Sequence, residues 1–266
     1  MNPNATSTPS APRSRRIDRR RHCGAIAQLA VLGLLPLFAG CADINFDATL
    51  NTGIQRLFTP GRTPQQELIL AVSSEDPDVR RGAVTKIAKS KKYNEEWALK
   101  GLRAIALLES DPQTRCVAIR TLTRSGDPRT VEVALMILNH DDYPAREVWP
   151  PPPIVRWDAA AALADLSERG QVPADKRDDV VRTLQKELRE GRERHTRIAA
   201  ARGLGCYPEP ATVDAVLDGL RDDDFAVVYA CEASLVKLTG YTHECSVLDW
   251  ETWRDAHRDD LFANAG

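Results

Sequence analysis

A short pattern recurs five times between Pro64 and Thr239, and this repetition limits the possible fold more than any other feature of the sequence. In the first copy, Arg80 is followed by Ala83 three residues later and by Ile87 seven residues later. The position of Arg80 recurs after 35, 41, 41 and 31 residues. A period of this size is typical of a solenoid built from helix pairs. The later copies are Arg115, Ala118, Leu122; Arg156, Ala159, Leu163; Arg197, Ala200, Leu204; and the degenerate Val228, Cys231, Leu235.

The repeated positions predict a narrow apolar stripe on one helix of each pair. A β-branched residue precedes the Arg position, and with the two positions that follow it gives the spacing i, i+4, i+8. The middle position is always Ala or Cys, and a small residue lets a neighbouring helix approach closely. One pair has too little apolar surface to be stable alone, so we expect the array to fold as a unit. The β-branched residues are Val79, Thr114, Val155, Thr196 and Val227.

Helix start signals recur with the same pattern. Asp76-Pro77 and Asp111-Pro112 place Asp at the N-cap and Pro at the first helical position, where its missing N–H costs nothing. Thr63-Pro64 does the same for the first partner helix, and Asp127-Pro128 and Glu209-Pro210 open later ones, although Glu is a poor cap. The partner helices are predicted at 64–73, 94–109, 129–139, 174–190 and 211–221.

These units resemble HEAT repeats, of the short bacterial kind also described as HEAT-like repeats of the phycobilisome-lyase type. The match is carried by Asp76-Pro77-x-Val79-Arg80-x-x-Ala83 and by the same pattern from Asp111 to Ala118, with looser copies at 155–163, 196–204 and 227–235. The resemblance implies an all-α fold: an α-solenoid of about five HEAT-like helix pairs with a capping C-terminal helix. It implies little about function, because this fold hosts scaffolds, adaptors and a few enzymes.

Residues 1–40 are predicted to be an export signal with a disordered basic start. Six arginines precede an apolar stretch that ends in small residues just before Cys41. Residues 38–41 resemble a bacterial lipoprotein signal, which implies that Cys41 is the lipid attachment site and that the body faces the periplasm. The alternative is an uncleaved membrane helix at 23–40, whose 18 residues come close to the roughly 20 that span a bilayer. Ala42 favours the outer membrane.

We expect a tether at 41–63, the repeat array at 64–240 and a C-terminal cap at 241–266. Gly240 suits the end of a helix, and Asp249 is predicted to cap a last helix at about 250–262. Trp250 and Trp253 lie three residues apart and share one face of that helix. They should cover the open end of the core, because terminal repeats must be closed off for solubility.

The third unit carries an insertion at 140–153. Its run of four prolines should not be helical and favours polyproline II. Insertions in solenoids project from one face, often the one that binds. We expect a partner-binding loop here, with Trp157 nearby; the alternative is a rigid connector whose aromatic side chains pack onto the array. The candidate residues are Tyr143, Trp149, Pro150, Pro151, Pro152 and Pro153.

Two residue types leave alternatives open. The repeated arginines form either an anion-binding ladder or pairs with acidic and backbone groups of adjacent turns that fix the repeat spacing. Cys206, Cys231 and Cys245 are free thiols, or two of them form a disulfide, which an exported protein permits. A zinc site with His243 is the third alternative, although no CxxC or HxxxH spacing occurs.

No catalytic or cofactor-binding motif occurs in the sequence. GxSxG, HExxH, GxxxxGK[ST] and GxGxxG are all missing, so we expect no enzyme, no cofactor and no metal. Of 36 basic and 38 acidic residues, six and one lie in 1–40, which leaves a net charge of −7 for the rest and argues against nucleic acid. The expected function is a membrane-tethered scaffold or adaptor for other envelope proteins. The alternative is a lyase- or chaperone-like HEAT-repeat protein acting on a pigment or prosthetic group.

Overall fold

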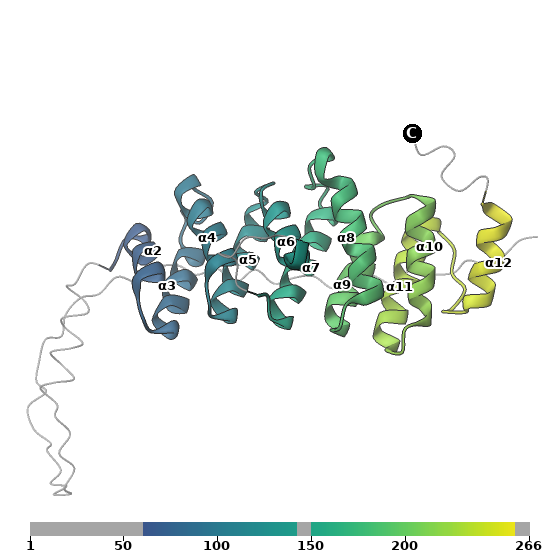
Figure 1. The fold of residues 1–266 in the computed structure, drawn as a ribbon. Helices are drawn as coiled ribbons and strands as arrows, with labels where there is room; N and C mark the ends of the chain where they lie inside the picture. Colours follow the sequence, from purple (N-terminus) through teal and green to yellow (C-terminus); the bar gives the residue numbers. More distant parts are fainter. Residues whose placement is uncertain (1–60, 143–149, 259–266) are drawn as a thin grey trace, which may run out of the picture. The chain divides into compact units, whose positions relative to one another are not determined.

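The computed structural model describes residues 61–142 and 150–258, and within these ranges all regular structure is helical. Eleven α-helices and three short 3-10 helices form five successive helix pairs, followed by a single helix, α12 (Figure 1). The α-helices are α2 Pro64–Ser73, α3 Pro77–Lys89, α4 Glu96–Leu108, α5 Pro112–Ser125, α6 Thr130–Leu138, α7 Pro153–Glu168, α8 Arg177–Glu190, α9 Arg194–Leu204, α10 Pro210–Asp218, α11 Phe225–Thr239 and α12 Val247–His257. The 3-10 helices are η1 His140–Asp142, η2 Ala174–Lys176 and η3 Gly219–Arg221.

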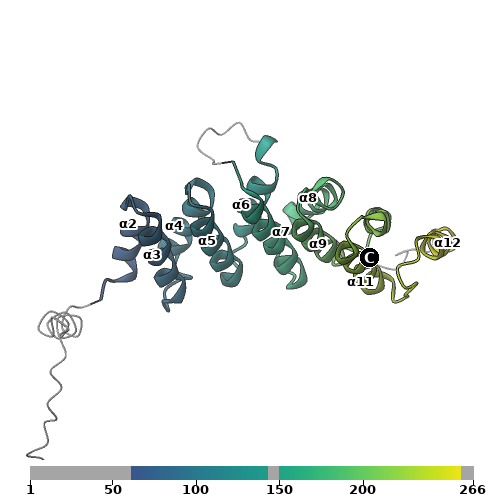
Figure 2. The same cartoon turned by 90° about the horizontal axis from the view of Figure 1, so that it is seen from below.

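The helices stack in two rows. The even row consists of α2, α4, α6, α8 and α10, and the odd row consists of α3, α5, α7, α9 and α11 (Figure 2). Each helix contacts the other helix of its pair and the next helix of its own row, and α12 continues the even row by packing on α10. The predicted all-α solenoid of five helix pairs is therefore confirmed.

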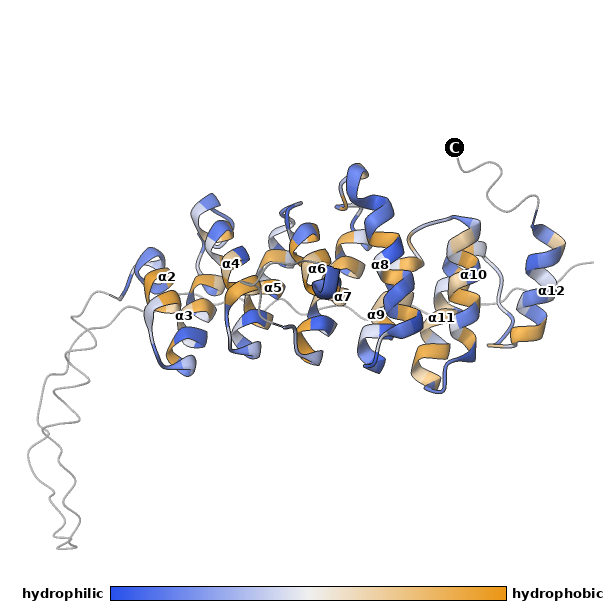
Figure 3. Ribbon diagram, viewed as in Figure 1, coloured by the Kyte–Doolittle hydropathy of each residue, from blue (hydrophilic) through white to orange (hydrophobic). Residues whose placement is uncertain are grey.

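The repeated sequence positions form the core between the two rows, where the apolar residues gather (Figure 3). In all five copies the Ala-type and Leu-type positions are at most 1% exposed. Complete burial of one Leu or Ile side chain stabilises a fold by about 1.5–3 kcal/mol. Four of the five β-branched residues are also buried, but Val79 is 38% exposed. The prediction is wrong for Val79 because α3 has no odd-row helix before it.

The helix starts mostly agree with the start signals. The Asp76 carboxylate accepts a hydrogen bond from the Asp78 N–H, and the Thr63 hydroxyl accepts one from the Gln66 N–H. Glu209 precedes α10 without capping it. Asp127, however, lies one turn before α6, whose N-cap is Arg129. The buried Asp127 carboxylate accepts a hydrogen bond from the Arg129 N–H at 3.0 Å and also pairs with the guanidinium of Arg103, Oδ2 to Nη1 2.8 Å.

The C-terminal helix closes the array as predicted, with one correction to its start. Trp250 is fully buried and Trp253 is 9% exposed, so both cover the end of the core. Helix α12 begins at Val247, and its N-cap is Ser246, whose hydroxyl accepts from the Asp249 N–H at 3.3 Å. Asp249 is therefore inside the helix and is not its cap. Gly240, with a φ of 80°, ends α11 as expected.

None of the helices in 61–142 and 150–258 has the length and apolar character that crossing a membrane requires. Cys41 and the predicted export signal lie outside the described residues, so the lipid attachment stays a prediction.

Candidate binding surfaces of the helix array

The predicted partner-binding loop lies between α6 and α7. Tyr143 and Trp149 fall outside the described residues, so their role stays a prediction. Trp157, which the sequence placed among the aromatic residues near the loop, is half-buried, and its ring stacks on His195 with 4.8 Å between centroids. Trp157 therefore belongs to the junction between α7 and α9.

The proline run ends inside a helix. Pro150 is exposed and Pro152 is extended, with φ −63° and ψ 162°. Pro153 is the first residue of α7, so the prediction that the run stays outside helices is wrong at this residue. Proline fits there because the first helical N–H has no partner within the helix.

A cleft of about 350 Å³ lies between α6 and α8, next to the start of the insertion. Its charged residues carry both signs: Lys186 lies 3.9 Å from Asp142, between Nζ and Oδ2, and Arg182 pairs with Asp179. The side-chain amide of Asn139 donates to the Thr183 hydroxyl at 2.9 Å. The cleft therefore offers charged and amide groups beside the predicted loop. Its lining consists of Leu135, Asn139, Asp142, Asp179, Arg182, Thr183 and Lys186.

A second cleft, of about 410 Å³, lies between α5 and α7 in the odd row; we call it the arginine groove. Ala161 and Ala162 belong to its apolar part, and three arginines line it: Arg120, Arg124 and Arg169. The groove was missed in the sequence, although Arg120 and Arg124 stand at i and i+4 on α5. Its complete lining is Arg120, Thr123, Arg124, Asp158, Ala161, Ala162, Asp165 and Arg169.

Each arginine of the groove is held by its own chain. The Arg120 Nε lies 2.8 Å from Asp158 Oδ2. The Arg124 guanidinium lies 4.3 Å from the centre of the Tyr93 ring, a cation–π contact, and Arg169 donates to the Thr123 carbonyl at 2.8 Å. Because only the carboxylates of Asp158 and Asp165 line the groove with the three guanidiniums, the groove keeps an excess of positive charge.

The repeated arginines bind neighbouring turns rather than a ligand. Arg80 makes two hydrogen bonds of 2.9 Å to the Glu109 carboxylate and one of 3.0 Å to the Ser74 carbonyl. Arg156 of α7 pairs with Glu187 of α8, which belongs to the following helix pair. Arg115, which is 1% exposed, donates to the Ala106 carbonyl at 2.8 Å. The interpretation that these side chains pair with adjacent turns is therefore confirmed.

Arg197 completes this set. It makes hydrogen bonds of 2.6 and 3.0 Å to the Asp222 carboxylate and one of 2.9 Å to the Gly191 carbonyl. Burial raises the pKa of Asp222, but the hydrogen bonds from Arg197 and from the Asp224 N–H, together with the charge of Arg197, outweigh burial and hold that pKa below its usual range. The acidic partners follow their arginines by 25 to 31 residues, a signal that could have been found in the sequence.

Four cysteines in the described part carry free thiols: Cys116, Cys206, Cys231 and Cys245. The structure therefore forms no disulfide among the three candidates. Burial raises the pKa of both Cys116 and Cys231 to about 12, so these thiols stay protonated at neutral pH. Within the same ranges, no three His, Cys, Asp or Glu side chains come together as metal ligands.

Comparison with known proteins agrees with this architecture. Residues 66–148 match the profile of the family described as HEAT repeats. The fold is similar to a solved structure from Nostoc sp. PCC7120, the complex of CpcE and CpcF of phycocyanin lyase. The TM-score is 0.50 at 19% sequence identity, covering 68% of this chain and 67% of that chain. A search of curated proteins found no match. The chain is thus a HEAT-like α-solenoid.

The similar structure corrects one prediction. The expectation that the chain is not an enzyme rested on missing sequence motifs, but a phycocyanin lyase uses the same type of fold. The missing motifs therefore do not exclude catalysis, and the prediction is contradicted. At this level of identity the likeness shows the fold alone, and the activity of the lyase stays with that protein.

Proposed function

We propose that this chain is a lyase- or chaperone-like HEAT-repeat protein that acts on a pigment or prosthetic group. The observation that carries the proposal is the arginine groove between α5 and α7. Ligand pockets combine apolar walls with a few well-placed polar groups, and arginine favours carboxylate ligands because it can bind them with two hydrogen bonds. The groove therefore fits a flat, largely apolar group that carries carboxylates.

The arginines of the groove are held in place by the chain itself, and a different cleft is available for the protein that carries the group. The contacts of Arg120, Arg124 and Arg169 with their own chain fix the three guanidiniums before a ligand arrives. Pre-ordered side chains lose little conformational entropy on binding, so they bind more tightly than free ones. The mixed charges of the cleft between α6 and α8 supply a separate surface for the protein that carries the group.

The proposal is tested by the colour of the purified chain and by titration with biliverdin, a linear tetrapyrrole with two carboxylates. We expect a shifted absorption spectrum on binding. The variant Arg124→Gln should weaken binding about tenfold, the effect of losing one charge-assisted hydrogen bond. Arg182→Gln, in the cleft between α6 and α8, is the matched control and should bind as the wild type. A colourless chain without a spectral shift, or equal weakening in both variants, would contradict the proposal.

We also propose, from the N-terminal sequence, that the chain is tethered in the cell envelope through lipidated Cys41 and binds a protein partner there. The basic start, the apolar stretch and the small residues before Cys41 support this location. Mass spectrometry of the mature N-terminus should find a diacyl or triacyl Cys41. An unmodified chain that begins at Met1 would contradict the anchoring, and a pull-down from envelope extract that recovers no specific partner would contradict the binding.

A further inference from the structure

Two sequence positions recur at the junctions between successive odd-row helices. The first lies one residue after the repeated Arg position. In α5 it is Cys116, whose thiol contacts the carbonyl of Ile154 at 3.8 Å. In α7 it is Trp157, which stacks on His195 of α9. This position therefore belongs to the junction between successive odd-row helices.

The second position lies eight residues after the Arg position. In α7 it is Ala164, so close to Gly203 of α9 that a Cβ on the glycine would lie 3.3 Å from the Ala164 Cα. In the α9 repeat it is Gly205, the residue that ends the helix, whose added Cβ would lie 3.1 Å from Ser234 of α11. Small residues make these junctions tight, and both positions are covered by the following helix.

In α11 the same two positions are open. Tyr229 is 65% exposed and Val236 is 36% exposed, and Phe225, one turn before Tyr229, is 73% exposed. These three residues lie on the side of α11 opposite Ser234, whose hydroxyl donates to the Ala201 carbonyl of α9 at 2.9 Å. Helix α12 packs on α10 and contacts α11 through the hydrogen bond from the Trp250 indole to Glu232, but it leaves Phe225, Tyr229 and Val236 exposed. We call Phe225, Tyr229 and Val236 the terminal face.

We propose that the terminal face binds the same face of a second copy of this chain, with the two α11 helices antiparallel about a two-fold axis. A two-fold interface uses one surface on both partners, so that surface must fit itself. The three exposed side chains of the terminal face are apolar, and opposite charges lie near its two ends: Asp223 and Asp224 before α11, and Lys237 in its last turn. Antiparallel pairing brings Lys237 of each copy to the acidic end of the other.

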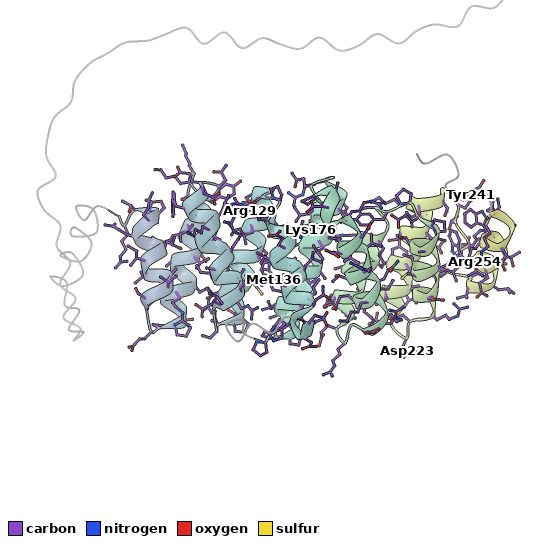
Figure 4. The ribbon with its side chains drawn as sticks, turned by 45° about the horizontal axis from the view of Figure 1, so that its top comes forward. Arg129, Met136, Lys176, Asp223, Tyr241 and Arg254 are labelled. Carbon is purple, nitrogen blue, oxygen red and sulfur yellow. The ribbon has the colours of Figure 1, made fainter. Side chains whose placement is uncertain are left out.

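At the other end of the array, the surface of the odd-row helix α3 does not match the terminal face. There the exposed odd-row positions around Val79 are charged, with Asp78 79% and Lys86 60% exposed in their side chains. A second array cannot continue the two rows of this one, because α12 already occupies the even-row place next to α10. Asp223 and Tyr241 lie at opposite ends of α11 (Figure 4).

The first test measures the mass of the full chain in detergent solution by sedimentation equilibrium. We expect a dimer for the wild type and a monomer for Tyr229→Glu, since a charge in an apolar contact costs binding energy. Val72→Glu is the matched control: Val72 is 63% exposed on α2, at the far end of the array, and should leave the dimer intact. A monomeric wild type, or a dimer that responds equally to both variants, overturns the proposal.

The second test uses charge reversal. Lys237→Glu should raise the dissociation constant of the dimer about tenfold, because it sets like charges against Asp223 and Asp224. Adding Asp223→Lys to the same chain should restore most of the affinity, since the pair is rebuilt with reversed signs. Circular dichroism melts report whether each variant is folded. Failure of the double variant to recover affinity overturns the antiparallel arrangement.

Discussion

One buried carboxylate organises the C-terminal end of the array. The carboxylate of Glu232 accepts hydrogen bonds from the Trp250 indole at 2.6 Å, the Thr242 hydroxyl at 2.7 Å, and the N–H groups of His243 and Cys245 at 3.1 Å each. Glu244 and Cys245 have positive φ angles of 52° and 64°. Such backbone is strained without glycine and persists only when neighbouring groups hold it. Glu232 therefore fixes the conformation of the turn that leads into α12.

We predict that Glu232→Ala lowers the free energy of unfolding by about 2–3 kcal/mol, because four donors lose their acceptor. Burial raises the pKa of Glu232, but the hydrogen bonds, with that from Trp250 the strongest, outweigh burial and lower it. This stabilisation is complete above the unfolded pKa of about 4.3 and is lost as the pH falls through the lower folded pKa. Urea melts at several pH values should show this loss in the wild type but not in Glu232→Gln.

A charge at a small core position should unfold the array. Ala118 is fully buried between stacked helices, so we predict that Ala118→Glu costs at least about 3 kcal/mol. Gln113→Glu is the control on the same helix, because Gln113 is exposed in the first turn, where a negative charge is favourable. Thermal melts should separate the two variants; similar melting temperatures would show that the assigned helix face is wrong.

At the scale of the helices, three of the repeated arginines, Arg80, Arg156 and Arg197, join one helix pair to the next. Arg197 connects α9 to the loop before it and to Asp222 after η3. We predict that Arg197→Ala costs about 3 kcal/mol, because it leaves a largely buried carboxylate without its partner. Arg189→Ala is the control, since that side chain is 73% exposed on α8. An NMR titration should show the pKa of Asp222 rising in Arg197→Ala only.

The sequence correctly predicted the features that depend on the repeat period and on the helix N-caps. The spacing of Arg80 and its successors predicted five pairs, and the Asp-Pro signals located α3 and α5, because both features act within one helix. The arginine groove was missed because it exists only where α5 and α7 pack together. The ion pair of Asp127 with Arg103 was missed for a similar reason, because it joins two different helices; the Asp127 carboxylate still accepts from the Arg129 N–H just before α6.

At the scale of the whole molecule, the C-terminal segment protects the last repeat. A chain that ends after Gly240 loses the buried Trp250 and the nearly buried Trp253. We predict that it is less stable by about 3–5 kcal/mol, the usual cost of removing one buried tryptophan, and that it binds the dye ANS. A chain that ends after Arg258 keeps both tryptophans and is the control. Equal urea midpoints for the two chains would show that α12 does not close the core.

The arginine bridges also affect how such a chain can change its length. The bridges of Arg80, Arg156 and Arg197 each connect a helix pair to the pair that directly follows it, as Arg80 with Glu109 and Arg197 with Asp222 show. A duplicated segment from one loop to the next would bring its own arginine and its own acid, and would find matching partners on both sides. Gene duplication can therefore extend this array from within, while the two ends keep their distinct surfaces.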